Sequence, residues 1–469
     1  MAATTARRKT VDEALATTEE EGAKLRRDLN RLDVVVIGVG VIIGAGIFVL
    51  TGQAAAESAG PAITLSFVVA GVVSGLAALC YAELAAMVPV SGSAYTFSYV
   101  TLGEILAFMV GWDLILELTV GSATVAVGAG GYLNETLSGL FGLSLPEAIT
   151  APPGEGGVVN VPAIVVVLLL TGVLVRGIRP TARVNAAIVA VTISVLVLVV
   201  VAGGTAVDTA NWTPYFPFGA VGVLGGAAVV FFAYIGFDIV ATTAEETRNP
   251  QADMPVGILG SLAIVTVLYV LVAAVITGMV PFAELAGETP VAEAFAAVDM
   301  PVVTIIVFAG ALLALFKTTL LLMLGQTRVA FAMARDRLLP PWLSRTHPKW
   351  QTPHRLTLIV GVVVAVLAGM VPIGTLADLV NIGTLFAFAL VAIGVLVLRR
   401  TDPDRERPFR VPLLPVVSVL TVLMSGTLVA TLGATNFIRF GVWLVLGVIV
   451  YFAYSRPRST VGRRGEATA

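Results

Sequence analysis

One basic residue, Lys317, lies deep inside a long apolar stretch of the sequence. At the rise of an α-helix it falls roughly 24 Å beyond Pro301, close to the middle of a membrane. A charged group at that depth is costly and marks a functional site by default. Because desolvation disfavours the ammonium form, the amine can exchange a proton. Lys317 therefore predicts proton binding, and the alternatives are snorkelling to a membrane surface or a fixed structural charge.

Three carboxylates lie in other apolar stretches. Asp113 and Glu117 are four residues apart, so they share one face of a helix, and Glu117 is the deeper of the two. Glu117 could carry a proton, select the substrate or pair with Lys317, and the sequence leaves these roles open. Asp238 follows Gly236 and marks either a break in its helix or the cytoplasmic end of that helix.

Glycines at positions 38, 40, 44 and 46 loosen the first apolar stretch, each costing about 1 kcal/mol relative to alanine. We predict that this helix unwinds near residues 43–46. Unwinding frees backbone amides and carbonyls at a depth where lipid cannot satisfy them. Half-helix ends carry partial charges of about +0.5 and −0.5, so two broken helices can bind a zwitterion.

A second break is expected in the sixth stretch, where aromatic residues precede Gly236 and Asp238. Phe231, Tyr234 and Phe237 are candidates for a lid, since flat side chains cover a cavity at low entropic cost. The two interrupted stretches stand five apart, which is the spacing that two inverted five-helix repeats produce.

The sequence offers no constellation typical of an enzyme. Cys80 is the single cysteine, so it forms no internal disulfide and no cysteine metal cluster. His347 and His354 fall in a polar loop. We therefore expect neither catalysis, a metal nor a cofactor, and the net charge of −2 argues against nucleic acid as a partner.

Composition places the chain in the lipid bilayer, with 57% hydrophobic and 12% charged residues. Apolar runs of about 20 residues predict an all-α protein with twelve transmembrane helices. The expected divisions are a tail at 1–33, a first five-helix repeat at 34–204, a second at 218–398, helices eleven and twelve at 411–455, and a tail at 456–469.

Basic residues orient these spans. The N-terminal tail, the loop after span ten and the C-terminal tail are rich in arginine, whereas loops on the opposite side carry Glu135, Glu155, Glu288 and other acids. Both termini are therefore expected in the cytoplasm, in a multi-pass protein of the cell membrane.

Short motifs in a fixed order resemble the amino acid-polyamine-organocation (APC) superfamily, most closely its cationic amino acid transporter branch. The likeness runs from Asp33 to Arg458. The motifs are Gly44-Ala45-Gly46-Ile47-Phe48, Tyr81-Ala82-Glu83-Leu84, Gly111-Trp112-Asp113, Phe232-Ala233-Tyr234-Ile235-Gly236-Phe237-Asp238, Glu245-Glu246-Thr247-Arg248-Asn249-Pro250 and Gly325-Gln326-Thr327-Arg328.

The resemblance implies a LeuT-like fold of two inverted five-helix repeats with helices one and six broken. It also implies that an amino acid's carboxylate meets backbone amides around Gly44, Ala45 and Gly46. The ammonium would meet carbonyls at both breaks, which carry over to Ile42 or Ile43 and to Phe232, Ala233 and Ile235.

The sequence departs from the family at the coupling cation. Proton-coupled relatives often carry a lysine in span five, where this chain has Thr192. Lys317 places a positive charge in span eight instead, so the coupling cation is moved to another helix rather than lost. Sodium coupling through the hydroxyls of Thr192, Thr318 and Thr319 and the carbonyls of span one is an alternative, and the adjacent ammonium opposes it by charge repulsion.

These observations predict a secondary amino acid transporter that works by alternating access. Proton-coupled uptake is favoured, and neutral substrates are favoured over cationic ones. The alternatives are an exchanger or uniporter, a sodium symporter and, more remotely, an amino acid sensor that does not transport.

Overall fold

The computed structural model describes the chain except for residues 1–6, 20–26, 91, 144, 178–181 and 463–469. Parts of both predicted tails thus lie outside the described residues. Within those residues every regular element is a helix, and an isolated β-bridge pairs Leu29 with Thr247. The longer α-helices are α2 (Arg31–Ile42), α4 (Ile63–Met87), α6 (Glu104–Phe141), α7 (Val161–Val175), α8 (Ala182–Gly204), α9 (Gly219–Val230), α11 (Pro250–Met279), α13 (Pro301–Arg335), α14 (His354–Met370), α15 (Ile373–Thr401), α16 (Leu414–Thr431) and α17 (Ala434–Val450).

Shorter helices connect or extend these elements. They are α1 (Val11–Glu19), α3 (Thr51–Ala54), α5 (Ser93–Thr101), α10 (Phe237–Val240), α12 (Pro290–Ala297) and α18 (Arg456–Arg458).

Nine helical segments in the described chain are long and apolar enough to cross a membrane. Two further apolar helices, α7 and α14, are shorter and coincide with the fourth and ninth predicted spans. The first predicted span is divided, because α2 ends at Ile42 and helix resumes toward α4. The structure thus confirms an all-helical membrane protein, and the number of twelve spans stays a prediction.

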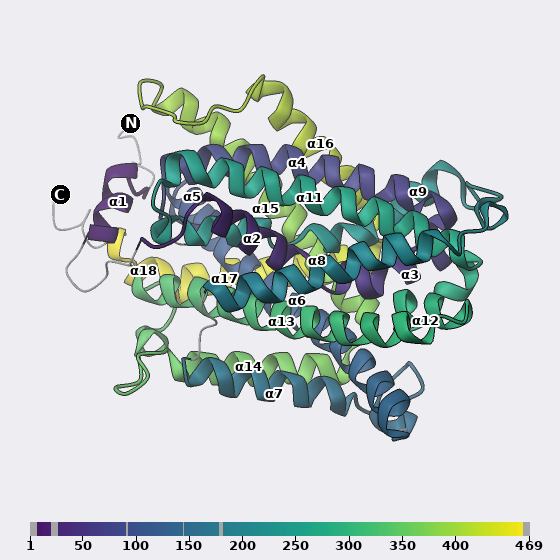
Figure 1. Cartoon of the computed structure of the whole chain (residues 1–469). Helices are drawn as coiled ribbons and strands as arrows, with labels where there is room; N and C mark the ends of the chain where they lie inside the picture. The colour runs from purple at the N-terminus through teal and green to yellow at the C-terminus, as the bar shows by residue number, and fades with distance from the viewer. Residues whose placement is uncertain (1–6, 20–26, 91, 144, 178–181, 463–469) are drawn as a thin grey trace.

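The helices pack in pairs that lie five predicted spans apart (Figure 1). Helix α4 packs on α11, α6 on α13, and α7 on α14. The α7–α14 pair runs beside the main bundle at the bottom of the view. The long helices α6 and α13 lie centrally, so residues on their facing sides are enclosed by the other helices.

Helix α2 begins at a reciprocal cap. The side chain of Asn30 accepts hydrogen bonds from the backbone amides of Leu32 and Asp33, and the Asp33 carboxylate accepts one from the Asn30 amide. This capping box satisfies amides that an uncapped helix start leaves unpaired. It sets the register of the first span, and with it the position of the break twelve residues later.

Glu83 has a structural role at one end of the bundle. Its carboxylate accepts hydrogen bonds from the Arg399 guanidinium and the Val411 amide, and it lies 3.6 Å from the Nε of Arg407. Glu83 is 1% exposed. The contacts tie α4 to the end of α15 and to the loop that leads to α16, so this carboxylate is a loop partner.

Candidate functional site

The first span breaks directly after α2. Ile43 has extended backbone angles (φ −74°, ψ 106°), and helix resumes with a π-helical segment at Gly46–Leu50. The carbonyls left near the break have partners. The Tyr269 hydroxyl donates to the Ile42 oxygen at 3.0 Å, and the Thr318 hydroxyl donates to the Ile43 oxygen at 2.9 Å. A carbonyl has two lone pairs, so both oxygens can accept a second donor.

The sixth span breaks between Tyr234 and α10. A 3₁₀ turn covers Phe231–Tyr234, Ile235 is extended (φ −65°, ψ 138°), and Gly236 has a φ of +117°. That φ is accessible to glycine and strained for other residues. A Cβ at Gly236 would also lie 2.6 Å from Cγ1 of Val41. Glycine is therefore required here by conformation and by space.

The two breaks touch each other. A Cβ on Gly46 would lie 2.2 Å from the Cα of Ala233, closer than any side chain allows. A Cβ on Gly44 would lie 2.9 Å from Cγ2 of Thr318 on α13. The glycines of the first span thus let its backbone reach the sixth span and α13 directly.

A small cavity of about 10 Å³ lies between the breaks, which is room for about one water molecule. An amino acid therefore requires the surrounding helices to move apart. No charged side chain of the described chain lines this cavity. The residues that line it come from four spans and are Val41, Ile42, Gly44, Ala45, Gly46, Gly121, Val125, Phe232, Ile235, Thr318 and Leu322.

Three residues of the cavity, Gly121, Val125 and Leu322, were not among the predicted site residues. Their spacing could have indicated them, because Gly121 and Val125 continue the four-residue series from Glu117, and Leu322 lies four residues after Thr318. Residues at this spacing share a helix face. The faces that carry the candidate polar residues therefore also contribute the apolar walls of the cavity.

The aromatic residues of span six divide into two groups. Phe232 lines the cavity, as does Ile235. Phe231 packs against Phe388 with ring centroids 5.7 Å apart, and Tyr234 donates a 2.7 Å hydrogen bond to the Phe67 carbonyl. Phe231 and Tyr234 are thus held by packing in this conformation, and neither lines the cavity.

Phe237 belongs to the packed group as well. Its ring lies 5.5 Å from that of Tyr81 and 5.0 Å from that of Phe388. Ala233 lies against Gly46 at the contact between the breaks and is 1% exposed.

Lys317 lies where α2, α8 and α13 meet. Its side chain is buried, and its Nζ has no hydrogen-bond partner within the described chain. The Nζ lies 3.3 Å from the position that a Cβ on Gly40 would take. Gly40 precedes the break by one helical turn, so the amine lies beside the broken helix.

The buried carboxylates stand apart from this amine. Asp113, Glu117 and Asp238 are at most 2% exposed. Every ion pair recorded for the described residues involves other groups, so the Glu117–Lys317 pair that the sequence left open is not formed in this conformation. Both carboxylate oxygens of Asp113 and of Glu117 are buried without a hydrogen-bond partner in the described structure.

The two threonines considered for ion coupling have different partners. Thr192 on α8 donates to the Ile188 carbonyl of its own helix at 2.9 Å. Thr318 donates across helices to Ile43. Thr318 therefore contacts the break, whereas the Thr192 hydroxyl satisfies its own helix.

Further cavities lie on either side of the site. One of about 300 Å³ reaches Val49 and Gly128 and contains the carboxylates Glu57, Glu155 and Glu288. Desolvation within the cavity raises the pKa of Glu288, and neighbouring carboxylates, Glu135 first, raise it further. The sequence analysis used these acidic loop residues only to orient the chain.

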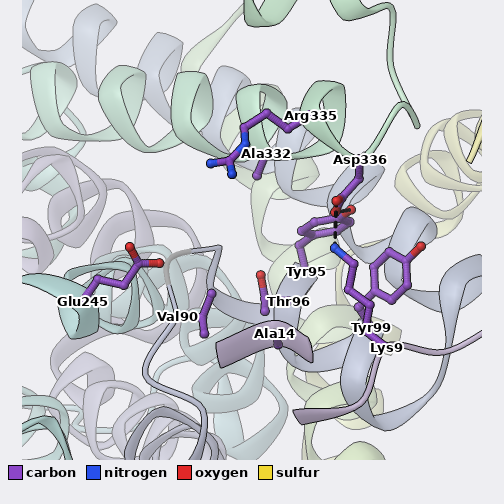
Figure 2. A pocket seen from close by; sticks show the side chains of 10 residues that line it. All are labelled: Lys9, Ala14, Val90, Tyr95, Thr96, Tyr99, Glu245, Ala332, Arg335 and Asp336. Atoms are coloured by element: carbon purple, nitrogen blue, oxygen red, sulfur yellow. Dashed lines mark hydrogen bonds and ion pairs between the residues drawn. The ribbon is translucent and has the colours of Figure 1, made fainter. Parts of the chain in front are cut away.

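A cavity of about 100 Å³ lies at the other end, beside the N-terminal segment. Figure 2 shows the side chains that line it. Lys9 forms a 2.7 Å ion pair with Asp336, whose carboxylate also accepts a 2.6 Å hydrogen bond from the Tyr95 hydroxyl. The segment around Lys9 is therefore fastened to the end of α13. The sequence analysis treated the lysine only as an orienting charge.

Comparison with known proteins places the chain in a family. A family model described as "Amino acid permease" matches residues 29–454. The "Branched-chain amino acid permease BcaP" of Bacillus subtilis (strain 168) is 46% identical over 462 residues, 97% of this chain and 99% of that protein. The "Methylthioribose transporter" of the same organism is 43% identical over 447 residues, 95% and 97% of the two chains.

A plant relative is also similar. The "Cationic amino acid transporter 4, vacuolar" of Arabidopsis thaliana is 42% identical over 404 residues, 85% of this chain and 67% of that protein. These relatives are membrane transporters rather than enzymes, and membership of the family implies the LeuT-like fold. With two broken helices meeting at a buried cavity and a family match across nearly its whole length, this chain belongs to the amino acid permeases of the APC superfamily.

Proposed function

We propose that this permease takes up neutral amino acids with apolar side chains across the cell membrane, coupled to protons. The observation that carries the substrate class is the cavity between the breaks, whose side-chain walls are apolar except for the Thr318 hydroxyl. A cationic side chain placed there would lack a carboxylate partner and would be desolvated at high cost. The named substrates of the relatives differ, so the composition of this cavity decides our proposal.

The broken helices supply groups for the zwitterion. Gly44, Ala45 and Gly46 open the second half of span one, where a helix start favours an anion, so their amides would receive the substrate carboxylate. The carbonyls of Ile42 or Ile43, and those of Phe232, Ala233 and Ile235, would receive the ammonium. The apolar side chain would then lie against Val125 and Leu322.

Proton coupling is assigned to Lys317, with Glu117 as a second titratable group of the bundle. The support is the position of the amine against α2, one turn before the break, in a place without a hydrogen-bond partner among the described residues. Movement of α2 during transport would change the surroundings of the amine, and hence its affinity for a proton. Sodium coupling through Thr318 and Thr192 is less well supported, because the adjacent Lys317 ammonium would repel the cation.

Alternating access would use two repeats, at 34–204 and 218–398, with helices at 411–455 outside them. The pairing of α4 with α11, α6 with α13 and α7 with α14 supports this division, since each pair joins equivalent members of the two repeats. Both termini are assigned to the cytoplasm. Arg7 near the start of the chain donates to the carbonyl of Arg456 near its end, so both described ends lie on one side.

Transport into proteoliposomes tests the proposal. Radiolabelled leucine, alanine and arginine would be offered with an inward pH gradient, an inward sodium gradient or no gradient. We expect leucine to accumulate under the pH gradient alone and arginine to remain near background. Preferential uptake of arginine would overturn the substrate class, and accumulation driven only by sodium would overturn the assigned ion.

A further inference from the structure

Gly40 of α2 faces Lys317 on α13 and two residues of α8. A Cβ on Gly40 would lie 2.6 Å from Cγ2 of Val189 on α8, 3.3 Å from Nζ of Lys317 on α13, and 3.9 Å from Oδ1 of Asn185 on α8. Because the last two distances start from the same point, the amine and the amide oxygen lie at most about 7 Å apart. Because position 40 carries no side chain, no atom of that residue's side chain separates the amine from the amide oxygen.

Both polar atoms in this space lack partners. Lys317 is 5% exposed and Asn185 is 8% exposed, and neither Nζ nor Oδ1 has a hydrogen-bond partner within the described residues. An unsatisfied buried polar atom costs about 1 to 3 kcal/mol. Two such atoms that face the same gap, a donor and an acceptor, can each satisfy the other directly or through one water molecule.

Other charged groups do not account for the amine. On the helices packed against α13, the buried acids Asp113 and Glu117 belong to α6, and Asp238 belongs to the neighbouring α10. None forms an ion pair with Lys317 in the described chain. On α8, Arg183 is exposed near the helix start. Asn185 therefore supplies the unpartnered acceptor on the α8 side.

We propose that Asn185 is a positioning residue for Lys317, and that its side-chain oxygen holds the protonated amine in one state of the transport cycle. The proposal rests on the coupling role assigned to Lys317 above. Asn185 lies in the first turn of α8, on the cytoplasmic side in the proposed orientation, whereas Lys317 lies midway along α13. The amide thus lies on the side to which the proton is released.

The gap at Gly40 connects this pair to the substrate site. Gly40 is in α2, whose end at Ile42 contributes to the cavity. A shift of α2 on substrate binding would widen or close the space between the amine and the amide oxygen. Asn185 would in this way make the affinity of Lys317 for a proton depend on the position of the broken helix.

The test compares two near-isosteric variants of the full-length protein. Asn185→Leu keeps the size of the side chain and removes the acceptor, whereas Asn185→Asp keeps an acceptor oxygen. We expect Asn185→Leu to lower pH-gradient-driven leucine accumulation by about tenfold, a factor typical of the coupling between two sites. Leucine counterflow should fall much less. Asn185→Asp should retain accumulation with an altered pH profile.

Ser194→Ala is the matched control, because its exposed hydroxyl donates to the Ala190 carbonyl of its own helix α8. Thermal unfolding of each purified variant shows whether it folds. If Asn185→Leu folds and accumulates leucine like Ser194→Ala, the positioning role is excluded. The same exclusion follows if Asn185→Asp loses accumulation as completely as Asn185→Leu does.

Lys317→Ala separates this inference from the proposed function. If Lys317→Ala alone accumulates leucine normally, the coupling assignment itself fails. If Lys317→Ala abolishes accumulation and Asn185→Leu does not, only the role of Asn185 fails. In the double variant, leucine counterflow should equal that of Lys317→Ala alone, since a positioning residue has nothing left to position.

Discussion

The hydroxyl of Thr318 on α13 donates a 2.9 Å hydrogen bond to the carbonyl oxygen of Ile43, at the break of the first span. The two residues are 275 positions apart in the chain. Thr318 directly follows Lys317, so one short stretch of α13 contacts both the broken backbone and the gap at Gly40. The proposed substrate and proton sites are thereby joined through adjacent residues.

Replacing Thr318 by valine tests this contact. Valine has nearly the same shape but cannot donate, so the Ile43 carbonyl loses its partner at a cost of about 1 kcal/mol. We expect the apparent KM for leucine to rise by about fivefold, the equivalent of that energy. Thr319→Val is the control, because its hydroxyl bonds to Leu315 within α13. Equal KM values for the two variants would show that the contact does not shape the site.

The contact between Gly46 and Ala233 predicts that no side chain is tolerated at position 46. Gly46→Leu should insert into the membrane but lose substrate binding, measured by calorimetry on the purified protein, because the two breaks are forced apart. Gly225→Ala on α9 is a matched control, since a Cβ there meets nothing within 4 Å. If Gly46→Leu binds the substrate with normal affinity, the first break is not part of the binding site.

The two groups of aromatic residues in span six should respond differently to alanine. Phe232→Ala removes a wall of the cavity, and we expect KM to rise by about tenfold, or ~1.4 kcal/mol. Phe231→Ala removes a packed ring and should instead lower the unfolding temperature, because cavity creation in a core costs about 3 to 5 kcal/mol. A large KM effect from Phe231→Ala with unchanged stability would favour a lid role for Phe231.

Lys317→Ala should abolish accumulation driven by a pH gradient and preserve much of the counterflow, which needs no gradient. Adding Thr192→Lys should restore part of the accumulation, because it places an amine on α8, which packs against the broken helix α2. Uptake by each variant would be measured with and without the gradient. Loss of counterflow together with accumulation would favour a structural charge over a coupling role.

Glu288 predicts a pH dependence of stability. Glu288 is exposed by surface area, but desolvation within the cavity and neighbouring carboxylates raise its pKa above the usual 4.5. The folded protein therefore holds the proton more tightly than the unfolded chain, and ionisation of Glu288 lowers stability as the pH rises through the raised pKa. Glu288→Gln should melt at a higher temperature than the parent at neutral pH. The difference in melting temperature should vanish at a pH below 4.5, where Glu288 is protonated in both the folded and the unfolded parent protein.

Glu284→Gln is the control for this experiment, since Glu284 is a loop carboxylate that is absent from the lining of the 300 Å³ cavity. Thermal melts of the three proteins across pH would be compared. A Glu288→Gln variant that is less stable than the parent at neutral pH would contradict the assigned sign.

The sequence alone predicted the helical membrane class and both breaks, because these features depend on local properties. Glycine loosens a helix wherever it occurs, and an apolar run long enough to cross a bilayer is recognisable without its neighbours. Hydropathy could not decide the number of spans. The first predicted span divides at Ile42, and its second half continues through helical turns that include Glu57 and Ser58 into α4.

The tertiary structure alone decided which side chains meet. A 3₁₀ turn at Phe231–Tyr234 followed by extended Ile235 changes the direction of successive side chains, so Phe232 lines the cavity and Phe231 and Tyr234 do not. Likewise, Asn185 and Lys317 lie on helices far apart in sequence, and only the packing of α8 and α13 around Gly40 brings their unpartnered atoms to one gap. Such contacts depend on how helices cross, which no periodicity within a single helix encodes.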